Sequence, residues 1–196
     1  MKYMTPDLLA QFRSENDDIA DAAAAEWDRQ CEAYIAHLKE VRPSLSPGAR
    51  RLLRHYNFHD AKMTALAADD VPHFSIFVEL DDPAEPDGKK NLELRYRLVG
   101  GPPQGFEVKK HEALVGDGRP FGWWLYDEFD VSTGDVPAMT HSILFTGGYE
   151  IRLTFFSVSC RRLDFLSLPA DENGLGSPKV AGQWASLKEL LRSGTS

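Results

Sequence analysis

Residues 74–98 read FSIFVELDDPAEPDGKKNLELRYRL, and this stretch decides the class of fold. Its two ends are apolar or alternate between apolar and polar residues, which is the period of a β-strand. The middle, residues 81–91, contains two prolines and an Asp-Gly pair, which are typical of a hairpin loop. The sequence therefore predicts two antiparallel strands, at residues 74–80 and 92–98, the second of them half buried.

Three capping residues mark helix starts in the first third of the chain. Thr5 and Ser46 each precede a proline, the residue preferred at the first helical position. Ser14 precedes a long apolar stripe at helical spacing, and Pro43 is expected to end that second helix. Residues 1–56 are therefore predicted to form three helices.

Strand-like segments follow the helices. Residues 123–131 suit a strand, and residues 139–158 form the best further hairpin, with its turn at a glycine pair. Because helices precede strands without βαβ alternation, the sequence predicts an α+β fold in a single domain. The helical segment would pack on a curved antiparallel sheet at residues 57–168, a sandwich or a partial barrel. A loop and a short terminal helix are expected at residues 169–196.

Composition and charge exclude several classes of protein. The chain has 196 residues, is 42% hydrophobic and carries a formal net charge of -8, as expected for a globular domain. The acidic balance argues against nucleic-acid binding, because phosphate contacts need a positive surface. No apolar run approaches the roughly 20 residues of a membrane-spanning helix, and no apolar signal segment follows Met1. Cys31 and Cys160 do not suggest a disulfide framework, so the predicted compartment is the cytoplasm.

Sequence motifs for cofactors and metals are missing. The glycine pairs lie between strands, so neither precedes a helix whose N-terminus would bind phosphate. His55 and His59 have the spacing of ligands on one helix face, but His59 falls in a strand-like segment. We therefore predict no cofactor and no bound metal.

The stretch FGWWLYDEFD at residues 121–130 is the most unusual part of the chain. Side chains of a strand alternate between two faces, so Trp124, Tyr126 and Glu128 are expected to share one face. That face combines flat aromatic surface with acids. Such a surface suits recognition of a polar ligand, a cation or a partner protein.

Asp127 lies on the opposite, otherwise apolar face of this strand, together with Trp123, which is expected in the core. A carboxylate in an apolar row is costly unless it finds a partner. His59, His141 or an arginine would supply that partner. The residues alone leave the choice open.

The turn of the second hairpin determines which of its side chains lie together. A two-residue turn at Gly147-Gly148 would place Ile143 opposite Arg152. His141 would then share a mixed polar face with Arg152. If this hairpin lies beside the strand at 123–131, both residues would join its aromatic and acidic face.

Three segments carry a resemblance to known families: MKYMT at residues 1–5, FHDA at 58–61 and WWLYDE at 123–128. They resemble an uncharacterised bacterial family with a domain of unknown function, whose members join a helical N-terminal part to a strand-rich part. The Phe-His-Asp step followed by strands is also similar to immunity proteins of polymorphic toxins. The resemblance implies a bacterial, cytoplasmic protein that binds rather than catalyses, and it supplies no catalytic residues.

Our first functional hypothesis is a non-enzymatic binding protein. It would use Trp124, Tyr126 and Glu128 to hold a partner protein or a small polar ligand. This view rests on the missing nucleophile and cofactor motifs and on an aromatic face that is costly to leave bare. As an immunity-like protein, its acidic surface would complement a basic toxin.

Two other interpretations remain open. The protein would be a small hydrolase or isomerase if His59, which adjoins Asp60, acted as a general base oriented by Asp127. It would be a subunit of a homodimer if the aromatic residues formed an interface between two copies of the chain. Whether the protein is an enzyme is thus not decided by its sequence.

Overall fold

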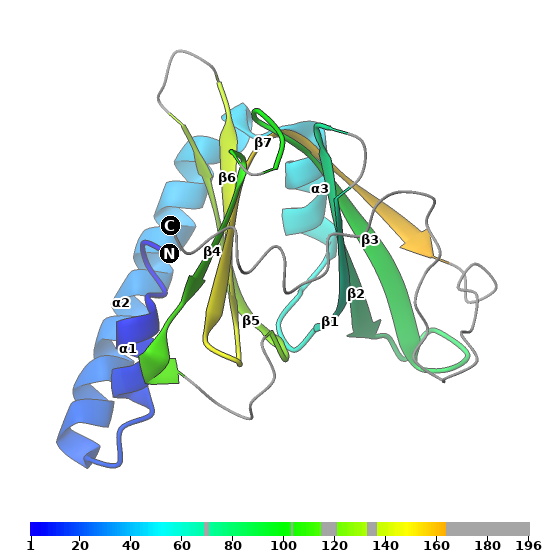
Figure 1. The fold of residues 1–196 in the computed structure, drawn as a ribbon. Coiled ribbons are helices and arrows are strands. Elements are labelled where there is room, and N and C mark those ends of the chain that lie inside the picture. The colour runs from blue at the N-terminus through cyan, green and yellow to red at the C-terminus, as the bar shows by residue number, and fades with distance from the viewer. Residues whose placement is uncertain (69–70, 103, 115–120, 133–136, 164–196) are drawn as a thin grey trace.

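The computed structural model describes residues 1–163 except 69–70, 103, 115–120 and 133–136. Helices precede strands, and the strands form a curled antiparallel sheet, so the predicted α+β fold is confirmed (Figure 1). The helices are α1 (Pro6–Phe12), α2 (Asp17–Val41) and α3 (Pro47–His55), with 3-10 turns η1 (Arg42–Ser44) and η2 (Glu112–Leu114). The strands are β1 (Lys62–Ala68), β2 (His73–Asp81), β3 (Lys89–Leu98), β4 (Phe106–Lys110), β5 (Trp124–Val131), β6 (Met139–Phe145) and β7 (Tyr149–Leu163). The expected terminal helix at 169–196 lies outside the described residues.

The sheet curls around its long strand β7. Its strand order is β1-β2-β3-β7-β6-β5, and β4 also pairs with β7. The first part of β7 pairs with β6 and β4, whereas its second part pairs with β3. The curl brings the two outer strands together at one end, where Lys62 bridges Trp123 and the Asp60 N–H donates to the Trp124 carbonyl. The sheet is therefore a partly closed barrel.

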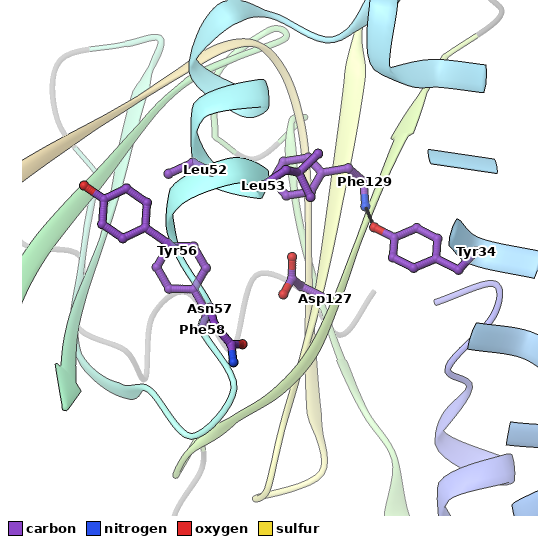
Figure 2. A pocket seen from close by; sticks show the side chains of 8 residues that line it. All are labelled: Tyr34, Leu52, Leu53, Tyr56, Asn57, Phe58, Asp127 and Phe129. Atoms are coloured by element: carbon purple, nitrogen blue, oxygen red, sulfur yellow. Dashed lines mark hydrogen bonds between the residues drawn. The ribbon is translucent and has the colours of Figure 1, made fainter. Parts of the chain in front are cut away.

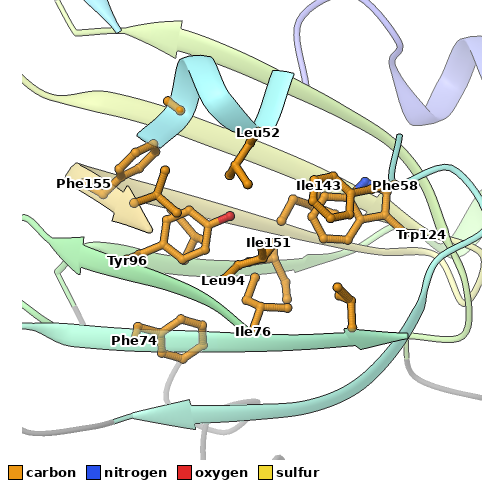
Figure 3. Packing of buried hydrophobic residues seen from close by; sticks show 14 of the residues in the cluster. Leu52, Phe58, Phe74, Ile76, Leu94, Tyr96, Trp124, Ile143, Ile151 and Phe155 are labelled. Atoms are coloured by element: carbon orange, nitrogen blue, oxygen red, sulfur yellow. The ribbon is translucent and has the colours of Figure 1, made fainter. Parts of the chain in front are cut away.

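The main core fills the inside of this curl. Alternate residues of β3 point into it, and Leu92, Leu94, Tyr96 and Leu98 are all fully buried. Helix α3 lies between the two halves of the sheet and contributes Leu52 (Figures 1 and 3). A smaller cluster on the outer side of β5 and β6 joins the sheet to α1 and η2 through Leu9, Leu114, Leu125 and Leu144.

The helix caps agree with the sequence at two of three starts. The Thr5 hydroxyl accepts from the Leu8 N–H, and the Ser46 hydroxyl accepts from the Ala49 N–H. The cap of the second helix is Asn16 rather than the predicted Ser14: the Asn16 side chain accepts from the Ile19 N–H, and the helix begins at Asp17. None of the described helices combines the length and the hydrophobicity needed to cross a bilayer.

The turn between β6 and β7 is longer than predicted. The Phe145 carbonyl accepts from the Gly148 N–H, and Gly148 has a φ of 79°, as in a three-residue loop with a glycine bulge. The extra residue moves the pairing by one position, so Ile143 lies opposite Ile151 rather than Arg152. This shift exchanges the partners across the whole hairpin, because strand side chains alternate with a period of two.

Candidate functional site

A β-bulge in β5 decides which side chains reach the inside of the curl. Trp124 pairs with Phe145, but Tyr126 pairs with Leu144, so Leu125 is the extra residue. The bulge brings Trp124 onto the same face as Asp127, which simple alternation had separated. Trp124 is therefore fully buried, whereas Trp123, expected in the core, is 39% exposed.

Asp127 is the centre of a buried polar network on this inner face. Its Oδ2 lies 3.0 Å from His141 Nε2, and its Oδ1 accepts from Trp124 Nε1 at 3.1 Å. On the other side of the imidazole, the Tyr96 hydroxyl lies 2.8 Å from His141 Nδ1. The ring of Phe129 stacks on the imidazole with 3.8 Å between ring centroids. Side chains of three strands, β3, β5 and β6, thereby hold one carboxylate in a defined position.

Both ring nitrogens of His141 have a side-chain partner in this network. Burial, followed by the charge of Asp127, raises the pKa of Tyr96 well above its ordinary value, so the phenol keeps its proton. That proton needs an acceptor, and His141 Nδ1 is the partner that the structure provides. On the other side of the ring, Nε2–H donates to the Asp127 carboxylate, which can only accept. The carboxylate is thus held by two side-chain N–H donors, from Trp124 and His141.

A pocket of about 160 Å³ opens beside Asp127, between α2, α3 and β5 (Figure 2). Tyr56 and Phe58 lie on one side of the carboxylate, and Phe129 and Tyr34 lie on the other. The lining residues are Tyr34, Leu52, Leu53, Tyr56, Asn57, Phe58, Asp127 and Phe129. Asp127 is the sole charged residue among these eight, and its side chain is 22% exposed.

Tyr34 ties the wall of this pocket to the sheet. Its hydroxyl accepts from the Phe129 N–H at 2.7 Å, which joins α2 to β5. Burial and then the nearby Asp127 raise the pKa of Tyr34 strongly. The phenol therefore stays protonated and adds no second charge to the pocket.

The predicted aromatic and acidic face of Trp124, Tyr126 and Glu128 is wrong. Trp124 is in the core, and Tyr126 packs against Trp27 of α2 with 4.6 Å between ring centroids. Glu128 is buried, and its carboxylate accepts from the backbone N–H groups of residues 2–4 at 2.6–2.8 Å. The protein's own N-terminal segment and helices cover the face that was expected to hold a partner.

The predicted pair of His59 and Asp127 is also wrong. His59 lies in the turn before β1, half exposed, with Nδ1 2.9 Å from the carboxylate of the adjacent Asp60. Asp127 uses His141, which was one of the three partners that the sequence left open. A general base at His59 would therefore not be oriented by the Asp127 carboxylate of β5.

Arg152 and His141 do not share a surface, contrary to the prediction. With the shifted register, His141 lies opposite Leu153 inside the curl, whereas Arg152 lies opposite Ser142 and is exposed. Tyr34 and Tyr96, which do belong to the site, were missed. The signal for Tyr96 was present, because its hydroxyl sits in an otherwise apolar row of β3 and needs a buried partner.

Glu150 anchors the N-terminal segment beside Glu128. Its carboxylate pairs with the Met1 amino group and lies 3.0 Å from His111 Nε2. Burial acts to raise the pKa of Glu150, but the Met1 amino group and His111 outweigh it and hold the pKa below its ordinary value. The two acids of the outer face thus serve the docking of residues 1–4.

This lowered pKa predicts a specific loss of stability in acid. Because the folded state favours the ionised Glu150, its contribution is present above the ordinary pKa near 4.5 and disappears as the pH falls through the folded value. We expect Glu150→Gln to cost about 2 kcal/mol at pH 7. Urea unfolding of untagged protein between pH 3 and 7 measures both effects.

The difference in unfolding free energy between wild type and Glu150→Gln should shrink as the pH falls below about 4.5. Glu112→Gln is the matched control, because Glu112 is 77% exposed and pairs with Lys110 at the surface. A difference that stays constant across the pH range would contradict the assignment.

Comparison of the chain with models of known protein families, with curated proteins and with solved structures finds no match. The resemblances noted in the sequence therefore stay predictions.

Proposed function

We propose that the protein is a binding protein for a small ligand, which it holds in the pocket beside Asp127. The supporting observation is the fixed carboxylate at the edge of an aromatic pocket. Asp127 is oriented by His141 and Trp124, and the remaining lining is apolar apart from the Asn57 amide and two phenols. Ligand sites have this composition, a mostly apolar hollow with a few fixed polar groups.

Binding is favoured over catalysis by what the pocket offers chemically. Its eight lining residues contain one carboxylate but no thiol, amine or imidazole. Acid–base catalysis usually needs a second group to return the proton, and the nearby His141 is fully buried behind Asp127. The proposal keeps the predicted class of function and replaces the surface that was expected to perform it.

A fragment screen tests this proposal directly. Ligand-induced shifts of backbone amides in the NMR spectrum should cluster at residues 52–58 and 127–129. We expect Leu53→Phe, which adds volume to the pocket wall, to weaken any such fragment at least tenfold. The matched control is Ile35→Phe, because Ile35 is 53% exposed on α2 and lies outside the pocket lining.

Equal weakening by both variants would show that the shifts report a change in fold rather than a site. The proposal would be overturned if no fragment bound at this pocket. It would also be overturned if Leu53→Phe left the affinity of the bound fragments unchanged. Thermal melting of both variants shows whether the fold is kept.

A further inference from the structure

We propose that the ligand of this pocket is a small organic cation, a protonated amine on a compact apolar body, with its nitrogen on Asp127. This inference rests on the proposed function and names the class of ligand. It is carried by the charge of the pocket, by the bonds that Asp127 already makes and by the rings around it.

The charge balance of the site is uneven. Asp127 contributes one negative charge, and no lysine, arginine or histidine is among the eight lining residues. Within the described chain, its ion-pair partner is His141, which is fully buried and does not line the pocket. The field of the carboxylate is felt nearby, because it contributes to the raised pKa of both Tyr34 and Tyr96. An incoming cation would therefore meet a carboxylate in a lining that holds no cationic side chain.

The carboxylate also has room for further donors. An ionised carboxylate has about four acceptor positions, and Asp127 uses one for Trp124 and one for His141. Among the described residues no other donor takes the remaining positions, so they can accept an ammonium N–H. A charged donor in a half-buried site forms a stronger hydrogen bond than a neutral one. An anionic ligand would instead be repelled.

The aromatic lining favours the same class of ligand. Four of the eight lining residues, Tyr34, Tyr56, Phe58 and Phe129, are aromatic and flank the carboxylate on two sides (Figure 2). The negative faces of such rings attract ammonium groups and also accept an apolar ligand body. Leu52 and Leu53 extend the apolar part of the wall.

The volume sets the size of the ligand. A pocket of about 160 Å³ is close to the roughly 150 Å³ cavity that accommodates benzene in another protein. One six-membered ring or a short branched chain therefore fits beside the ammonium group. We expect benzylammonium to be a suitable probe.

The test compares three probes of nearly equal shape. Benzylamine, which is protonated at pH 7, benzyl alcohol and benzoate are titrated separately into the full chain, and NMR shifts at residues 52–58 and 127–129 are followed. We expect benzylammonium to bind at least tenfold more tightly than benzyl alcohol, and benzoate to bind most weakly. Asp127→Asn should reduce the preference for the cation to about twofold.

Asp130→Asn is the matched control variant. Asp130 lies on the same strand, but it faces α2, where it bonds His37 at 2.9 Å. We expect this variant to keep the full preference for benzylammonium. If Asp127→Asn does not fold, the comparison of the three probes on wild type still decides the inference.

The outcomes separate the class of ligand from the function itself. If benzyl alcohol or benzoate binds as tightly as benzylammonium, the inference that the ligand is a cation is wrong, but the proposal of a ligand-binding pocket stands. If none of the three probes binds at millimolar concentration, the inference of a cationic ligand is also overturned. The fragment screen then decides separately whether the pocket binds anything.

Discussion

Gly48→Ala is expected to lower the free energy of unfolding by about 3 kcal/mol or more, at or beyond the upper end for overpacked sites. A Cβ at Gly48 would lie 1.6 Å from the Val158 carbonyl oxygen and 2.8 Å from its carbon. Both are backbone atoms of β7, so no side chain can rotate away. Helix α3 would have to move from the sheet, although it carries the fully buried Ala49 and Leu52.

Urea unfolding of Gly48→Ala measures this loss. Gly88→Ala is the control, because Gly88 has a φ of 69° but no atom within 4 Å of the added Cβ. We expect the control to lose only the backbone preference, about 1 kcal/mol. If Gly48→Ala is as stable as wild type, the close packing of α3 on β7 at Gly48 is contradicted. Because α3 lines the pocket, the same change should also weaken fragment binding.

His141→Leu is expected to lower the free energy of unfolding by about 3 kcal/mol, because it removes the side chain that links Tyr96 to Asp127. The Tyr96 hydroxyl, fully buried, would lose its partner, and of the donors among the described residues Asp127 would keep the Trp124 N–H alone. Leaving a buried polar group unpaired costs about 1–3 kcal/mol, and more for a charged group. Chemical denaturation gives the magnitude directly.

A second substitution checks the cause of this loss. Tyr96→Phe removes the orphaned hydroxyl, so the double variant His141→Leu/Tyr96→Phe should be more stable than His141→Leu alone. In the wild-type background, Tyr96→Phe should instead destabilise by about 1 kcal/mol. A double variant less stable than His141→Leu would contradict the hydrogen bond between these side chains.

Local signals predicted the fold because they rest on neighbours in the chain. The caps at Thr5 and Ser46 bond groups three residues away, and the period of residues 74–98 is visible within each strand. These features produce helices followed by antiparallel strands. The need of Asp127 for a partner was also predicted from its neighbours in the chain, because they form an otherwise apolar row.

The prediction of which side chains share a strand face was less accurate, because one extra residue in a strand or turn moves the following side chains to the opposite face. A bulge at Leu125 and a three-residue loop ending at Gly148 each shift the alternation by one position. Both depend on how the strand fits its neighbours in the curled sheet. The bulge buries Trp124 and exposes Trp123, and the longer loop separates His141 from Arg152.

The amino-acid sequence by itself determined the α+β class, two of three helix caps and the presence of a carboxylate that needs a partner. Only the tertiary structure decided that this partner is His141, with Tyr96 behind it and Tyr34 across the pocket. Helix caps and strand periods follow from contacts within a few residues. The pocket is lined by residues of α2, α3 and β5, and Tyr34 and Asp127 are more than ninety positions apart in the sequence. Contacts over such separations follow from how the sheet curls.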